Sequence, residues 1–108
     1  MCPRDNGQAA IASLADLDRM VHEPARLAIL LHLYAAAEAD FLYIMRQTGL
    51  SQGNLSSHIS KLEAAGYIEV NKTFQGKMPR TLLRLTRNGR KALTEYRAAI
   101  VKALGTGK

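Results

Sequence analysis

The sequence predicts a mainly α-helical domain with one small β-hairpin. Its 108 residues provide for a single domain with a modest core. Apolar residues recur at helical spacing over most of the chain, and after Gly66 the period changes from 3.6 to 2, which is typical of strands. We therefore expect one domain over residues 9–104, with flexible ends at 1–8 and 105–108 that are rich in glycine and polar residues.

Helical spacing and end signals divide the first part of the domain into four helices. Pro24 suits a first helical turn, and Asp40 and Ser51 are good N-caps. Gly49 and Gly66 are residues of the type that commonly follows a helix end. The expected helices cover about 9–20, 24–37, 40–49 and 51–65.

Two short strands follow the fourth helix and form a hairpin at about residues 67–85. Residues 67–74 alternate apolar and polar side chains, as a half-buried strand does. Residues 81–85 have the apolar pattern needed to pair with them. Between the strands, the basic stretch QGKMP supplies the turn residues Gly76 and Pro79.

The last helix is expected at about 87–104, with Thr86 as its N-cap. It carries apolar residues at a 3-4-3 spacing, like the seam of a coiled coil. We expect this seam and the apolar residues of the first helix to join two copies of the chain in a homodimer, unless both helices fold back onto their own domain. The expected interface residues are Ile11, Leu14, Leu17, Leu93, Tyr96, Ile100 and Ala103.

The order of these elements defines the architecture. A short helix, a turn containing glycine and a second helix make a helix-turn-helix, and a hairpin directly after it makes the winged version. The complete prediction is a winged helix-turn-helix domain with N- and C-terminal dimerisation helices.

Composition is that of an ordinary globular domain, with 47% hydrophobic and 22% charged residues. No run approaches the roughly 20 apolar residues of a membrane span, and MCPRDNGQ lacks the apolar stretch of a signal peptide. The single cysteine, Cys2, cannot form an internal disulfide, which fits a reducing compartment. We expect a cytoplasmic protein with no membrane partner.

Charge is distributed unevenly along the chain. Residues 1–60 carry a net charge of −2, whereas residues 61–108 carry +8. Such asymmetry favours a polyanionic partner, with nucleic acid ahead of an anionic membrane surface. The alternative is that these surface cations serve only solubility.

The predicted helix 51–65 has an unusual polar face. Leu55, Ile59 and Leu62 fall within one narrow arc of the helix, as core residues do. A solvated face opposite them would be rich in Glu, Lys and Arg. Instead that face carries small residues, which indicates that another surface approaches it closely. They are Gly53, Ser57, Ser60 and Ala64.

Four stretches together resemble winged helix-turn-helix transcriptional regulators of the MarR/ArsR type, in a short single-domain branch. They are HEPARLAILLHL, FLYIMRQTGLSQGNLSSHISKLEAAGYIEV, QGKMPRT and LRLTRNGRKAL. The second is the most specific, because it combines turn, core and groove positions in one register. Wings of this type usually carry Asp-x-Arg near the tip, whereas this chain has Gly76 to Arg80 without an acidic residue.

The resemblance implies a sequence-specific regulator that binds a palindromic operator in double-stranded DNA as a homodimer. Its recognition helix would enter the major groove, where short side chains meet base edges. The expected DNA contacts of this helix are Ser51, Gln52, Gly53, Asn54, Ser56, Ser57, His58 and Lys61. The expected phosphate contacts of the wing are Lys72, Lys77 and Arg80.

Several of these residues have a simpler structural explanation. Ser51 is a helix cap first, with any phosphate contact secondary. His58 lies near the core arc, so packing against the helix flank competes with a DNA contact. The wing cations can be ordinary solvated residues.

Other functional classes receive little support from the residues. No acid–base pair, nucleophile motif or phosphate-binding loop is recognisable, so we expect no enzyme and no cofactor. A thiophilic metal site is not expected, because DFLYIMRQTG contains neither cysteine nor histidine, although His22 and His32 across a dimer stay open. The remaining alternative is a winged-helix protein-interaction module, which would usually expose an apolar or acidic face. The sequence does not indicate whether a small-molecule effector exists.

Overall fold

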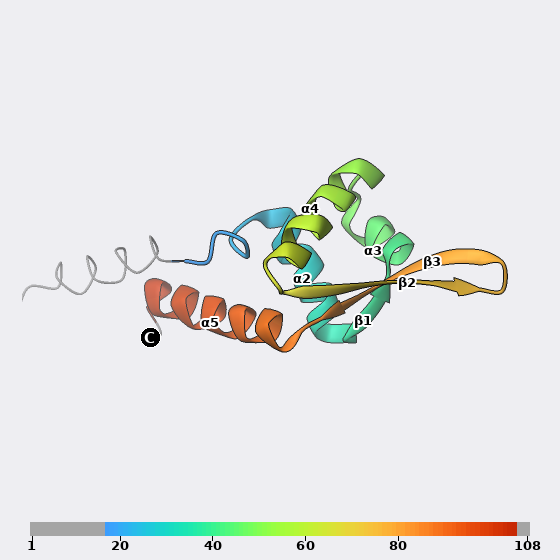
Figure 1. Ribbon diagram of the computed structural model, residues 1–108. Helices are drawn as coiled ribbons and strands as arrows, with labels where there is room; N and C mark the ends of the chain where they lie inside the picture. Colours follow the sequence, from blue (N-terminus) through green and yellow to red (C-terminus); the bar gives the residue numbers. More distant parts are fainter. Residues whose placement is uncertain (1–16, 106–108) are drawn as a thin grey trace, which may run out of the picture.

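The computed structural model describes residues 17–105. Its elements are α2 (Pro24–Ala36), β1 (Glu38–Asp40), α3 (Phe41–Thr48), α4 (Gln52–Ala64), β2 (Ile68–Gln75), β3 (Met78–Leu85) and α5 (Arg87–Leu104). The strands form one antiparallel sheet in the order β1-β3-β2, and α3 and α4 lie on one side of it (Figure 1). This arrangement confirms the predicted winged helix-turn-helix fold.

The helix ends follow the capping chemistry expected from the sequence. The side chains of Asp40, Ser51 and Thr86 each accept a hydrogen bond from a backbone N–H of the first turn, at 2.8, 3.2 and 3.0 Å. Each bond satisfies one of the free donors at a helix start. Gly49 ends α3 in the left-handed conformation, at φ 74°, which favours glycine. The N-cap of α2 is Glu23, directly before the expected proline.

The helix predicted over residues 9–20 does not reach residue 20. From Leu17 onward the chain makes turns until α2 begins. The reason is local, because the side chain of Asp18 accepts a 2.9 Å hydrogen bond from the backbone N–H of Met20, and such bonds compete with helix formation. The rest of that prediction, including Ile11 and Leu14, lies outside the described residues.

The hairpin spans nearly the predicted residues, but its second strand is longer and its turn shorter than the sequence pattern suggested. Its pairing runs without a break from Ile68 opposite Leu85 to Gln75 opposite Met78, so residues 76 and 77 alone make the turn. Gly76 has a φ of 63°, as its assignment to the turn requires.

Two features of the sheet differ from the expectation. Pro79 was expected in the turn, but it belongs to β3 and lies opposite Phe74. The three-residue strand β1 was not predicted, because it exists only through pairing with β3, where Glu38 lies opposite Arg84 and Asp40 opposite Leu82.

The core lies between the helices and the inner face of the sheet. Leu55, Ile59 and Leu62 of α4 are buried there, as their spacing predicted. They pack in one cluster with residues of α2, α3, the hairpin and α5. Burial of these three residues turns the opposite face of α4 toward solvent.

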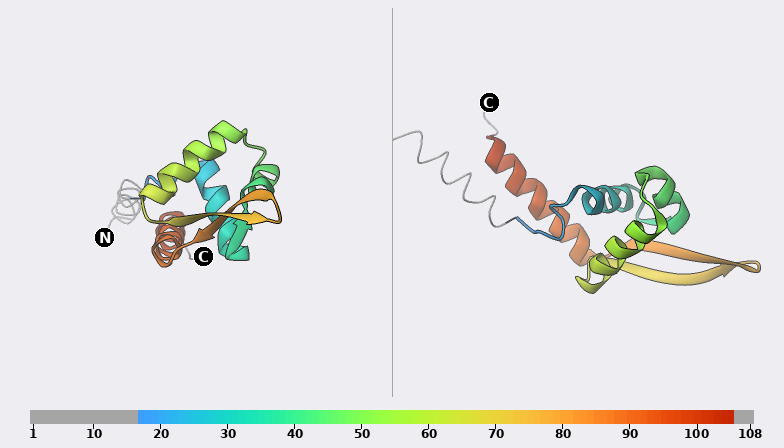
Figure 2. Two further views of the ribbon diagram at one scale, coloured as in Figure 1. Left: turned by 45° about the vertical axis from the view of Figure 1, so that its right-hand side comes forward. Right: turned by 90° about the horizontal axis from the view of Figure 1, so that it is seen from above.

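Two elements extend from this helical body. The hairpin and α5 leave it in opposite directions, as both figures show (Figures 1 and 2). Within the described part of the chain, no helix combines the length and apolarity needed to cross a membrane.

Candidate nucleic-acid interface

The outward face of α4 is exposed and lined by small polar side chains. Of the eight expected contacts on or next to this helix, seven are exposed and His58 is half-buried. A Cβ atom placed on Gly53 would meet nothing within 4 Å. No packing within the domain therefore requires glycine at this exposed helical position, where it costs up to about 1 kcal/mol relative to alanine.

A hollow of about 400 Å³ separates α4 from the wing. Gln52 and Ser56 line it from the helix, and Lys72 lines it from β2. The structure thus brings together two expected DNA contacts of the helix and one expected phosphate contact of the wing. Glu63 also lines the hollow, so its carboxylate would repel a phosphate at that end. The complete lining is Phe41, Gln52, Ser56, Ile59, Ser60, Glu63, Val70, Lys72 and Thr81.

The hollow is also lined by polar residues that the sequence reasoning did not select as contacts. Ser60 was recognised as part of the small-residue face but was not selected as a contact. Thr81 lies opposite Lys72 in the hairpin register and faces the same hollow. Its position two residues before the buried Leu83 was the available signal, because alternate strand residues share a face.

The expected wing cations differ in their surroundings. Lys72 and Lys77 are exposed, and neither belongs to the ion pairs found within residues 17–105. Arg80 is paired, because its Nε lies 3.0 Å from Oδ2 of Asp40. The Arg80 charge is therefore partly neutralised inside the domain.

Asp40 holds both α3 and the wing. The backbone N–H of Leu42, and secondarily the Arg80 guanidinium, keep the pKa of Asp40 below its ordinary value of 3.8. Because the pKa of Asp40 is lower in the folded than in the unfolded chain, its carboxylate stabilises the fold at pH values above the unfolded pKa. This contribution is lost as the pH falls through the folded pKa. The cap and the ion pair therefore weaken together only below about pH 4.

His58 is engaged by α2. Its Nδ1 lies 3.2 Å from Nη1 of Arg26, and the same guanidinium donates to the carbonyl of Met20 at 2.8 Å and to that of Arg19 at 3.3 Å. This contact corresponds to the alternative in which His58 packs within the domain, against the flank of the helix. Arg26 was not singled out from the sequence, because its partners lie up to 32 residues away.

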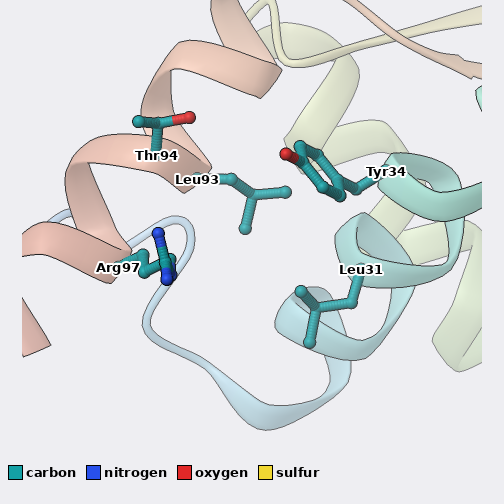
Figure 3. Close-up of a pocket in the computed structure, with 5 residues that line it drawn as sticks. All are labelled: Leu31, Tyr34, Leu93, Thr94 and Arg97. Carbon is teal, nitrogen blue, oxygen red and sulfur yellow. The ribbon is translucent and has the colours of Figure 1, made fainter. Parts of the chain in front are cut away.

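A second hollow, of about 380 Å³, lies between α2 and α5. Leu31, Tyr34 and Leu93 supply apolar surface, while Thr94 and Arg97 supply polar groups (Figure 3). Leu31 and Tyr34 are about half exposed. This partly exposed apolar surface lies outside the predicted DNA-binding face.

The expected dimer residues fall into different environments. Leu17 and Leu93 are 8% and 6% exposed, so each is already covered within the chain. Tyr96 packs partly against the core, and its hydroxyl lies 2.9 Å from Nδ1 of His22. Further along α5, Ile100 and Ala103 are half-buried, and Val101 and Leu104 are exposed. The free part of the predicted seam is thus its C-terminal end.

Comparison with known proteins assigns the chain to a family. Residues 25–104 match the family model described as a winged helix DNA-binding domain. A curated, uncharacterised protein of Methanocaldococcus jannaschii is 31% identical over 78 residues, which cover 72% of this chain and 85% of that protein. The chain therefore belongs to the winged helix DNA-binding domain family.

Solved structures of transcriptional regulators share this fold. The transcriptional regulator homologue of Pyrococcus horikoshii OT3 is 26% identical with a TM-score of 0.81, covering 86% of this chain and 94% of that one. The PcaV transcriptional regulator of Streptomyces coelicolor, solved with its natural ligand, is 22% identical with a TM-score of 0.68, covering 94% and 71%.

These matches confirm the resemblance to MarR-type regulators. The chain has the domain of a DNA-binding transcriptional regulator and not of an enzyme.

Proposed function

We propose that the chain is a sequence-specific regulator that binds a palindromic operator as a homodimer, in the cytoplasm where that DNA lies. The observation that carries the proposal is the hollow between α4 and the wing, where Gln52 and Ser56 face Lys72. A phosphate strand seated there places the outer face of α4 in the major groove.

Within that groove the first turn of α4 carries the base-reading groups. Gln52 and Asn54 are exposed amides, and each can bond adenine through two hydrogen bonds. Gly53 between them lets the backbone approach. Ser51 acts first as the cap, while Ser56 and Ser57 bond either bases or phosphates, and Lys61 meets the backbone one turn later.

The small size of the DNA contact that one recognition helix can make supports dimerisation. One recognition helix reads only a few base pairs, and α4 carries one Lys or Arg, Lys61. A second copy related by a twofold axis would add an equal contact about 34–36 Å away. The exposed apolar residues Val101 and Leu104 at the end of α5 supply a surface for that copy.

Selection of bound sequences from a random duplex library tests the proposal. We expect a twofold-symmetric sequence with half-sites about one helical turn apart. On that operator Asn54→Ala should cost roughly 1–3 kcal/mol of binding free energy, with a smaller cost on random duplex. An equal loss on both would remove the base-reading role, and failure to enrich any sequence would favour the protein-interaction module.

A second candidate function is response to a small apolar anion. The hollow between α2 and α5 combines the apolar Leu31 and Leu93 with the cation of Arg97 (Figure 3), which is the composition of a small-ligand site. PcaV, a neighbour in fold, binds a natural ligand. Benzoate should raise the melting temperature of the wild type and not of Arg97→Ala; equal responses would exclude this site.

A further inference from the structure

The projecting end of the wing carries large apolar side chains. Phe74 is 71% exposed and Met78 is 69% exposed, and Pro79, opposite Phe74, is exposed as well. The core of the domain ends further inward, at the buried Leu83. Packing within the described domain therefore gives no reason for an aromatic ring at residue 74.

Strand register places Phe74 on the side of the wing that faces α4. Lys72 and Thr81, which lie opposite each other, line the hollow beside α4. Phe74 and Pro79 are the next pair outward on the same face, because the register is unbroken and strand side chains alternate. Met78 lies opposite Gln75 and so belongs to the other face.

The charge around this ring fits a polyanion. Residues 70–85 contain four Lys or Arg and no Asp or Glu. Arg80 and Arg84 pair with Asp40 and Glu69, which leaves Lys72 and Lys77 outside the ion pairs of the described residues. Lys72 lies two residues inward on the face of Phe74, and Lys77 lies in the turn. An exposed aromatic ring beside cations fits a DNA duplex, because the phosphate backbone attracts the cations and the adjacent groove accepts an apolar side chain.

The reach of the strand also fits the duplex. Two residues of a β-strand span about 7 Å. When Lys72 contacts a DNA phosphate, Phe74 therefore lies about 7 Å further along the wing. The minor groove is about 6 Å wide. A wing that runs outward from that phosphate strand would therefore carry the ring over the minor groove, next to the major groove proposed for α4.

We propose that Phe74 is an apolar wedge that enters this minor groove and stacks at one base step, with Pro79 behind it. The inference rests on the proposed function and deepens it, because it adds a second element that selects sequence. Insertion of an apolar side chain unstacks a step, and flexible pyrimidine–purine steps such as TA unstack most easily. The wing would thus prefer deformable sequence without bonding any base edge.

The test compares Phe74→Ala with Met78→Ala on the selected operator. The two residues are almost equally exposed but lie on opposite faces, so both variants should melt like the wild type. We expect Phe74→Ala to bind about tenfold more weakly and Met78→Ala to bind nearly normally. Since no phosphate contact is lost, the salt dependence of Phe74→Ala should equal that of the wild type.

Operators with TA or AA at the step under the wing provide the second readout. The wild type and Phe74→Leu should prefer TA, and Phe74→Ala should bind both equally. With 2-aminopurine at that step, the wild type should increase the fluorescence because the base unstacks, and Phe74→Ala should not.

Several outcomes would overturn the wedge. If Phe74→Ala binds and discriminates like the wild type while the operator is still recognised, the wedge fails and the proposed function stands. Equal losses in Phe74→Ala and Met78→Ala would show a general effect of the wing tip. Binding to phosphatidylserine vesicles that depends on Phe74, with unchanged DNA binding, would assign the ring to a membrane surface. Absence of any DNA binding would remove both proposals together.

Discussion

Two glycines in helices show how differently the same residue type is used. At Gly89 in α5, a Cβ atom would overlap the carbonyl oxygen of Tyr67 and lie 2.7 Å from Cδ1 of Leu85. Glycine there lets the start of α5 pack against the chain entering β2. At Gly53 in α4 the corresponding space is empty. The first glycine is required by the fold, and the second fits the proposed approach of DNA to α4.

Alanine substitutions at these positions should therefore act in opposite directions. Gly89→Ala should lower the free energy of unfolding by about 1–3 kcal/mol, because its clash involves backbone. Gly53→Ala should raise it by up to about 1 kcal/mol while weakening operator binding. Chemical denaturation and DNA titration of both variants provide the comparison. A Gly53→Ala protein that is more stable and binds DNA normally would refute the close-approach role.

Tyr67 offers a separate check on the packing beside Gly89. Its hydroxyl donates a hydrogen bond to Asp18, and burial, followed by the Asp18 carboxylate, raises the pKa of Tyr67 to about 12. Because the folded pKa lies above the unfolded value of 10.0, the contribution to stability is complete below pH 10 and is lost as the pH rises toward 12.

Ultraviolet titration should show a tyrosine of the folded protein that ionises near pH 12. Tyr67→Phe should remove that late step. A late step that persists in the variant would belong to another tyrosine and contradict the assignment.

At the scale of elements, the wing combines its proposed DNA contact with a structural role. Lys77 in the turn is exposed, whereas Arg80 is anchored to Asp40 at the N-cap of α3. The ion pair ties the wing to the helix-turn-helix and sets its angle to the recognition helix. Substitutions at these two cations should therefore differ in their effects.

Lys77→Ala should weaken binding to operator and random duplex alike and lower the salt slope by about one unit, with unchanged stability. Arg80→Ala should also weaken DNA binding and lower the slope, but it should lower the melting temperature as well, because Asp40 loses its partner. Salt titrations and thermal melts distinguish the two. Unchanged slopes in both variants would show that the wing does not grip phosphate.

The elements also show how far sequence reasoning extends. Caps such as Asp40, Ser51 and Thr86 were predictable because each acts within its own first turn. Strand β1 was not, because three residues carry no periodic signal and pair with a segment more than forty residues away. The same holds for the contact between Arg26 and His58.

The candidate site follows the same division. The exposed face of α4 could be derived from helical spacing, because its opposite face had to be buried. The pairing of Arg80 could not, since its partner is distant in sequence. Leu93 has the correct spacing for a dimer seam and for a core helix, and apolar spacing alone does not distinguish the two.

At the scale of the whole molecule, the shape favours an assembly of two copies. The wing and α5 extend in opposite directions from the helical body (Figures 1 and 2), so contacts made through the end of α5 leave the wing and α4 free. Leu104 is 81% exposed and Val101 is 40% exposed, on a helix end that the domain core does not cover. A second copy covering this end would hold two recognition helices on one operator.

Ile100→Glu tests this arrangement, with Ala98→Glu as the matched control. Both place one carboxylate on α5, but the two positions lie about 200° apart around the helix, and Ala98 is exposed. Burial of an unpaired charge is costly, so Ile100→Glu should sediment as a folded monomer with much weaker operator binding. Ala98→Glu should remain a dimer. A wild type that sediments as a monomer at micromolar concentration, yet binds the palindrome tightly and without cooperativity, would refute the proposed dimer.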